Sequence, residues 1–200
     1  MKTIYFGNKK ILFSNLNNLS SQHTFTNPTA IEFDTIIKDF LQGVKSEILI
    51  KGNTTKNFSL FKKHFVNIEA CGGVVKNSNN LVLLIKRLGK WDLPKGKREK
   101  NENLSACASR EVEEECGINN LEILKKITAT YHIYIQNNET ILKTTHWFLM
   151  KYNGNQKLKP QYSEDISEAI WVDLDKFKID KTETYPNISD VLSLNKFYRV

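Results

Sequence analysis

The sequence lacks long apolar stretches. Nowhere among its 200 residues is there a run of about 18 apolar residues, the length that a membrane-spanning helix needs. The N-terminus, Met-Lys-Thr-Ile-Tyr-Phe-Gly, also lacks the apolar core of a signal peptide. We therefore expect no membrane partner.

Cysteine is scarce as well. The chain has only Cys71, Cys107 and Cys116, which form neither a CxxC pair nor the framework of a disulfide-rich domain. Small buried thiols are the default interpretation for the last two, which fall within or at the end of a predicted helix. Together with the missing signal peptide, this usage predicts a reducing, cytoplasmic location.

The positive charge is unevenly spread. Residues 1–68 hold nine lysines against four acidic residues, a net charge of +5 out of the total of +7. Such a balance favours anionic partners in general. The lysines are scattered rather than grouped with aromatic residues, so nucleic acid stays only an alternative partner.

Residues 1–66 predict a small ββαβα unit, or an extension of unknown role. Two short strands, 2–6 and 10–14, flank the turn signal Gly7-Asn8, and the polar stretch 16–26 reads as a loop. Asn27-Pro28 is expected to open a helix that Gly43 closes. A strand at 47–50 and a second helix from Asn53 or Thr54 complete the predicted order.

Residues 67–200 predict a second domain that is richer in strands. Strands are expected at 70–75 and 81–86, and two long strands at 123–136 and 140–152 with Asn137-Asn138 at the turn between them. A final helix is predicted at 186–194. Between the first and second pair of strands lies the stretch that carries the chemistry.

That stretch runs from Gly96 to Ile118 and contains a helix predicted from about Asn103 to Cys116. On it, Glu111, Glu114 and Glu115 are spaced i, i+3, i+4 and share one face. Like charges at this spacing cost roughly 0.2–0.5 kcal/mol per pair. A solvated face tolerates that cost, whereas a Mg²⁺ ion held by clustered carboxylates would turn the repulsion into binding. The spacing alone leaves both interpretations open.

The loop before this helix extends the pattern into a recognisable signature. The chain reads Gly, five residues, Glu, seven residues, Arg-Glu-aliphatic-any-Glu-Glu-any-Gly-aliphatic, which resembles the signature box of the Nudix hydrolases. The fixed positions are filled by Gly96, Glu102, Arg110, Glu111, Val112, Glu114, Glu115, Gly117 and Ile118. Seven fixed identities coincide by chance roughly once in 10⁸–10⁹ windows. The resemblance implies an α+β protein with the Nudix α/β/α sandwich and a mixed sheet, following the small N-terminal α/β unit.

The resemblance also implies a reaction and its residues. Nudix hydrolases cleave a diphosphate linkage in a nucleoside diphosphate joined to another group, with Mg²⁺ or, in its place, Mn²⁺. Glu111, Glu114 and Glu115 match the metal-ligand positions, and Glu111 also matches the general base of some members, whereas others use a base outside the box. Arg110 matches the arginine that orients this glutamate, and Glu102 matches a helper acid that supports the ligands.

Several residues outside the box are candidates for substrate contact. Lys95 could contact phosphate, Trp91 could stack on a base or cap the core, and Tyr131 could stack on a base. Glu164 is the first candidate for a further acid at the site and Glu168 is its rival.

The substrate is the least determined part of the prediction. Trp-Asp-Leu-Pro-Lys-Gly, residues 91–96, is similar to the turn of diadenosine polyphosphate and diphosphoinositol polyphosphate hydrolases. This favours a small-molecule polyphosphate, such as a dinucleoside polyphosphate. A 5′-end RNA pyrophosphohydrolase and a non-catalytic, nucleotide-binding Nudix module remain alternatives, and a homo-oligomer stays open.

Overall fold

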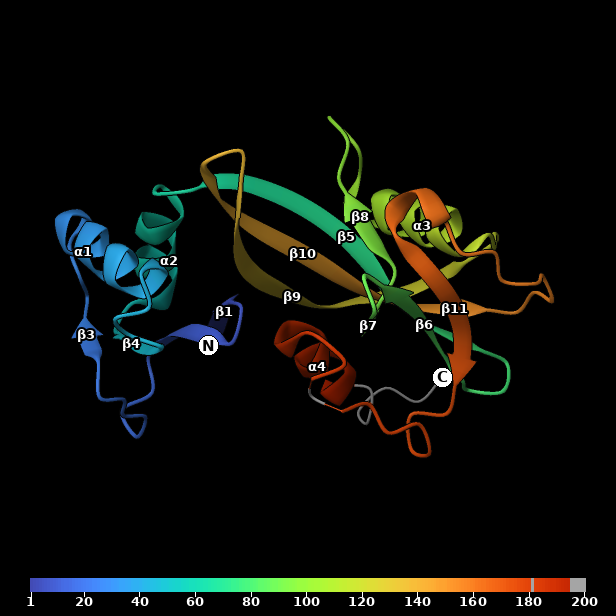
Figure 1. Ribbon diagram of the computed structural model, residues 1–200, viewed down its shortest axis with the longest axis horizontal. Helices are drawn as coiled ribbons and strands as arrows, with labels where there is room; N and C mark the ends of the chain where they lie inside the picture. The colour runs from blue at the N-terminus through green and yellow to red at the C-terminus, as the bar shows by residue number, and fades with distance from the viewer. Residues whose placement is uncertain (181, 195–200) are drawn as a thin grey trace. The chain divides into compact units, whose positions relative to one another are not determined.

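A computed structural model describes residues 1–180 and 182–194 (Figure 1). The chain divides into two compact units. The first contains Met1–Ile68 and Thr130–Thr144, and the second contains Glu69–Ala129 and the described part of Thr145–Val200. The division predicted after residue 66 did not anticipate that a hairpin tip far along the chain packs with the N-terminal residues. No helix of the described residues is long and apolar enough to cross a membrane.

The first unit is a mixed sheet with two helices on one side (Figure 1). β1 pairs antiparallel with β2, β2 and β3 each pair in parallel with β4, and β1 pairs in parallel with β9. Its elements are β1 Lys2–Phe6, β2 Lys9–Ser14, β3 Thr24–Thr26, α1 Ala30–Leu41, β4 Glu47–Lys51 and α2 Thr54–Lys62. The predicted order is therefore confirmed, except that β3 lies inside the stretch predicted as a loop.

The start of α1 differs from the prediction. Thr29, not Asn27, is the N-cap, and its side chain and that of Glu32 form a reciprocal capping box. Asn27 instead has a positive φ of 47°, and its side-chain oxygen accepts the backbone N–H of Asn53 at 2.9 Å. A side chain that bonds a distant backbone group in this way cannot be anticipated from local sequence, whereas the Thr-x-x-Glu pattern was available.

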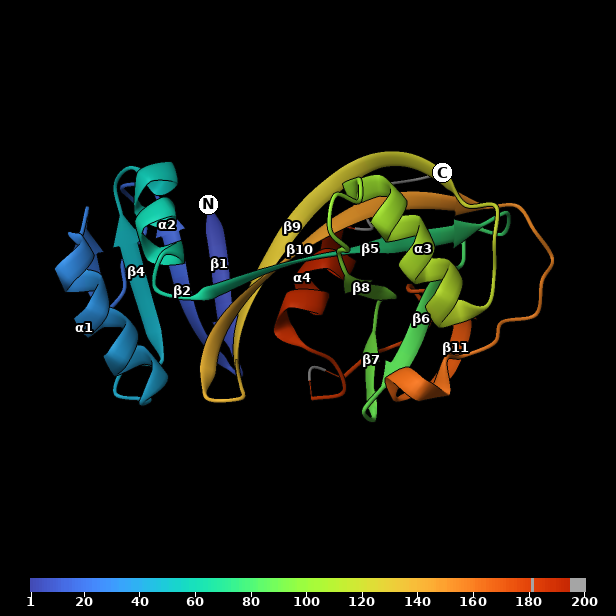
Figure 2. The same cartoon turned by 90° about the horizontal axis from the view of Figure 1, so that it is seen from above.

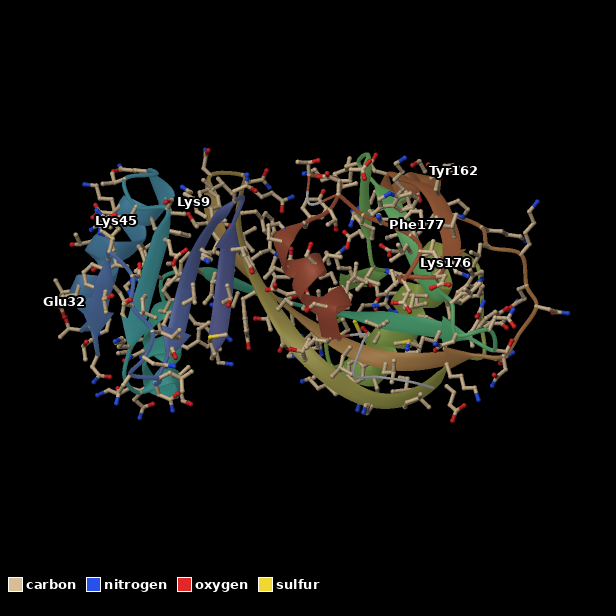
Figure 3. The ribbon with its side chains drawn as sticks, turned by 90° about the horizontal axis from the view of Figure 1, so that it is seen from below. Lys9, Glu32, Lys45, Tyr162, Lys176 and Phe177 are labelled. Atoms are coloured by element: carbon tan, nitrogen blue, oxygen red, sulfur yellow. The ribbon has the colours of Figure 1, made fainter. Side chains whose placement is uncertain are left out.

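The second unit is built on a sheet with strand order β11-β6-β5-β10-β9, to which β7 and β8 add as short side pairs of β6 and β5. β6 is antiparallel to both β5 and β11, whereas Figure 2 shows β5 and β10 running in the same direction, so the sheet is mixed. The strands are β5 Val66–Asn77, β6 Val82–Arg87, β7 Lys90–Asp92, β8 Lys95–Lys97, β9 Glu122–Gln136, β10 Glu139–Tyr152 and β11 Ile166–Val172. The helices are α3 Leu104–Cys116, the 3₁₀ turn Tyr162–Glu164 and α4 Pro186–Ser193.

Side chains alternate across this sheet and bury two separate cores. Residues such as Leu83 and Met150 pack with α3, whereas their neighbours Leu84 and Leu149 pack with α4. Figure 1 accordingly shows α3 and α4 on opposite sides of the sheet. The expected α/β/α sandwich is confirmed, and all three cysteines are buried free thiols.

Candidate functional site

α3 begins and ends where the sequence predicts. The Asn103 side chain caps the N-terminus by accepting the backbone N–H of Ser105 at 2.9 Å, and Gly117 ends the helix in the left-handed conformation with φ 67°. The helix buries a stripe of small and aliphatic residues: Cys107, Ala108, Val112 and Cys116. Burial of this stripe fixes the rotation of the helix, and therefore the direction of its signature side chains.

The strand β8 brings the backbone of Gly96 directly against Glu111. β8 pairs antiparallel with β5, with Cys71 opposite Gly96. A Cβ atom added to Gly96 would lie 1.7 Å from Glu111 Oε2, far inside contact distance. Glycine therefore leaves room for the Glu111 carboxylate in this position, whereas a side chain at residue 96 would displace it.

Arg110 is the centre of the ionic contacts at the site. Its Nε and Nη2 donate to the two oxygens of the Glu102 carboxylate at 2.8 and 2.9 Å. Its Nη1 donates to Glu111 Oε1 at 2.8 Å and to Glu114 Oε2 at 3.1 Å. The guanidinium holds the pKa of Glu102 down at about 2, so Glu102 is ionised at neutral pH. Arg110 thus contacts the Glu111 carboxylate directly, and its role in orienting that group for a reaction stays a prediction.

The three candidate ligands differ in environment. Glu114 is half-exposed, with 50% of its side chain accessible, whereas Glu111 is mostly covered and burial raises its pKa. Glu115 is only 2% exposed, and its Oε2 accepts the backbone N–H of Lys95 at 2.9 Å. Burial raises the pKa of Glu115 to about 7, although the charge of Lys95 favours the ionised form. A nearly buried carboxylate is costly unless a cation compensates it.

The donor set fits a hard divalent cation. Carboxylate oxygens are the ligands that Mg²⁺ and Mn²⁺ prefer, and three of them come from one helix face. Among residues 1–180 and 182–194, however, no group of three His, Cys, Asp or Glu side chains already converges as a metal cage. Arg110 instead joins Glu111 to Glu114, and Glu115 is bonded to the Lys95 backbone.

The side chain of Lys95 is committed within the protein. It is 7% exposed, and its Nζ lies 2.5 Å from Asp92 Oδ2 in a buried ion pair. Its ammonium is therefore paired with Asp92, and the group of Lys95 that hydrogen-bonds a signature glutamate is its backbone N–H.

The two aromatic candidates also pack inside the protein. Trp91 lies edge-to-face with Phe177 at 5.2 Å and packs against the α4 core, which favours the core role over stacking on a base. Tyr131 belongs to the first unit, where it is 9% exposed, contacts the ring of Phe58 at 4.8 Å and accepts a hydrogen bond from Lys2 Nζ at 2.9 Å. These contacts account for both rings without a substrate.

The two acidic candidates outside the box separate clearly. Glu164 pairs with Arg87 at 3.0 Å, and Arg87 is near enough to Glu115 to favour its ionised form. Glu168 pairs with Lys86 at 3.2 Å. Glu164 is therefore the one linked, through Arg87, to a signature glutamate.

One further group could not be found from the sequence: Arg98 and His146 both contact the carboxylate of Glu69. Glu69 and Arg98 are 29 residues apart, and His146 is 77 residues from Glu69. Local sequence pattern predicts no partner for a side chain at such separations along the chain.

Comparison with known proteins agrees with the geometry. The family model described as NUDIX domain matches residues 67–192. The chain is 31% identical over 119 residues to the RNA pyrophosphohydrolase of Pelagibacter ubique (strain HTCC1062), which covers 52% of this chain and 75% of that protein.

Solved structures show weaker overall similarity. The MutT protein from Methanosarcina mazei Go1 is 20% identical with a TM-score of 0.47, covering 66% of this chain and 95% of that one. The C. elegans Ap4A hydrolase in a binary complex is 21% identical with a TM-score of 0.43, covering 54% and 81%. Because the family model spans more than half of the chain and contains the complete signature, this chain belongs to the Nudix hydrolase family.

Proposed function

We propose that the protein hydrolyses a phosphoanhydride bond in a nucleoside diphosphate that is linked to another group, and that it requires Mg²⁺ or Mn²⁺. The contacts of Arg110 carry this proposal, because one guanidinium grips Glu102 bidentately and also holds Glu111 and Glu114. Such an arrangement fixes a set of negative side chains that water alone would leave disordered.

Glu111, Glu114 and Glu115 would hold the cation. Once bound, a divalent cation neutralises charge on the phosphates and lowers the pKa of a coordinated water. Glu111 is also suited to accept a proton, because burial raises its pKa towards the working pH. Arg110 limits this rise and keeps the carboxylate in one orientation.

A 5′-triphosphorylated RNA end is the first substrate to test, because the chain matches an RNA pyrophosphohydrolase over three quarters of that protein's length. A dinucleoside polyphosphate is the second, because residues 91–96 are similar to the turn of diadenosine polyphosphate hydrolases. Both carry a chain of phosphates on the 5′ oxygen of a nucleoside.

The test is a substrate panel with the full-length protein and Mg²⁺. It contains a 5′-triphosphorylated RNA oligonucleotide, diadenosine tetraphosphate, a nucleotide sugar and a diphosphoinositol phosphate, with released phosphate and nucleotide as readouts. We expect turnover of at least one of the first two, dependent on the metal and lost in Glu114→Gln. Glu113→Gln is the matched control, because Glu113 lies on the same helix at a position that the signature leaves free. Metal-independent turnover, or equal turnover in both variants, would refute the proposal.

A further inference from the structure

A second set of ionic contacts joins Glu69 to Arg98 and His146 and includes none of the candidate metal ligands. His146 Nε2 and Glu69 Oε1 are 3.1 Å apart, and Arg98 Nη1 donates to Glu69 Oε2 at 2.6 Å. Both oxygens of the Glu69 carboxylate are therefore engaged, one from strand β10 and the other from the segment that follows β8. The hydrogen bond from His146, together with Arg98, holds the pKa of Glu69 below its usual value, so this carboxylate is ionised.

Arg98 connects this pair to the signature loop. Its backbone N–H donates to the Glu69 carbonyl at 3.0 Å, and its side-chain Nε donates to the Glu102 carbonyl at 2.7 Å. Arg98 thus joins the beginning of the loop to β5 through its backbone, and it joins the end of the loop at Glu102 through its side chain. Between the two ends, Asn101 turns the chain with a positive φ of 64°, in the left-handed region that Asn adopts more readily than most non-glycine residues.

The same loop delivers the carboxylate that grips Arg110. Glu102 Oε2 also accepts the backbone N–H of Glu99 at 3.0 Å, so Glu102 is held at both its main chain and its side chain. From there the contacts continue through Arg110 to Glu111. The path from Glu69 to Glu111 therefore runs through the side chain of Arg98, the main chain and side chain of Glu102, and the guanidinium of Arg110.

We propose that Glu69 and Arg98 are positioning residues for hydrolysis: they fix the main chain of Glu102, and through Glu102 and Arg110 they fix the orientation of Glu111. His146 supports them by holding the second oxygen of Glu69. This inference rests on the proposed function, because it assigns the two residues an effect on the reaction of that site. Neither residue is expected to contact the substrate or the metal.

The first test measures kcat and KM of single variants of the full-length protein. Arg98→Ala should lower kcat by about 10- to 100-fold, the range seen when a group that supports catalytic ligands is removed, with KM nearly unchanged. Glu69→Gln should act in the same direction. Arg98→Lys should recover part of the loss, because one ammonium can reach either the Glu69 carboxylate or the Glu102 carbonyl but lacks the guanidinium fork that holds both. Lys100→Ala, an exposed charge in the same loop, is the control and should leave kcat unchanged.

The decisive comparison repeats Arg98→Ala in a Glu102→Gln background. If Arg98 acts through Glu102, the second substitution adds little to the loss caused by the first. Full, additive losses in the two backgrounds, or an effect on KM alone, would overturn the proposal.

A readout that needs no turnover separates this inference from the proposed function. The Nε–H of Arg110, assigned by its disappearance in Arg110→Lys, should give an NMR signal protected by its bond to Glu102. We expect that signal to be lost or to exchange faster with solvent in Arg98→Ala and Glu69→Gln, and to persist in Lys100→Ala. An unchanged signal would overturn the positioning role, whereas an inert wild-type protein with the expected NMR changes would overturn only the proposed reaction.

Discussion

Replacing Glu115 with Gln removes a charge from the most buried of the signature glutamates while keeping the size of the side chain. The amide oxygen can still accept the backbone N–H of Lys95, which Glu115 accepts at 2.9 Å. What disappears is the requirement to ionise a carboxyl that is only 2% exposed. In the absence of metal, we therefore expect the variant to be more stable than the wild type.

The size of the effect follows from the pKa of Glu115. Burial raises it from the usual value of 4.5 to about 7 in the folded protein. A difference of one pKa unit corresponds to about 1.4 kcal/mol, so the contribution of Glu115 to the free energy of unfolding should fall by about 3 kcal/mol as the pH rises from 4.5 to 7. The decline has this sign because the folded state binds more protons than the unfolded state in that window. Glu115→Gln lacks this loss, so its advantage should be near zero at pH 4.5 and reach about 3 kcal/mol at pH 8.

Thermal unfolding in the presence of a chelator measures the difference. For a chain of this size, about 3 kcal/mol corresponds to a rise in Tm of roughly 6–12 °C at pH 8. Addition of Mn²⁺ should then raise the Tm of the wild type but not that of the variant, because only the wild type keeps this ligand. Glu113→Gln is the control and should behave like the wild type, both with the chelator and after addition of Mn²⁺. An unchanged or lower Tm for Glu115→Gln at pH 8 would refute the argument from burial.

Three further predictions concern the same unit. Gly96→Ala should abolish turnover with the fold retained in circular dichroism, because the new Cβ would displace the carboxylate of Glu111; normal turnover would contradict the predicted overlap. Calorimetric affinity for Mn²⁺ should fall by up to about tenfold per pH unit below about pH 7, since Glu115 must lose its proton to bind; a flat profile would argue against Glu115 as a ligand. Burial lowers the pKa of His146 in the folded protein, and Glu69 opposes this shift. The free energy of unfolding should therefore decrease as the pH falls from 6.5 through the lowered pKa of the folded state. In urea unfolding, His146→Gln should lack this decrease.

Local pattern was sufficient for the helix that carries the site. Its predicted span, from about Asn103 to Cys116, depends on residues within a few positions of one another, although the sequence left Asn101 and Asn103 as alternative caps. The turn at Asn137 and Asn138, both with positive φ, was predictable for the same reason. The face on which the signature glutamates lie follows directly from helical spacing.

Side-chain partners could not be predicted in this way. A lysine in a phosphate-site turn suggested a free charge for Lys95, yet Asp92, three residues earlier, takes its ammonium in a buried pair. Tyr131 was a candidate for stacking on a base, but its ring instead contacts the ammonium of Lys2 and the ring of Phe58. Both outcomes depend on which backbone segments meet in space, and a single sequence carries no record of that.

The pairing of β1 with β9 has a practical consequence for anyone who shortens this protein. Ile4 lies opposite Tyr131 and Tyr5 opposite His132, so residues from the two ends of the first unit share one ladder. Cutting the chain near residue 66 would remove β1 and leave β9 as an exposed edge strand with unpaired backbone groups, which favours aggregation. Aggregation or loss of activity in a truncated protein would then result from the missing strand. It would not show what the amino-terminal segment does.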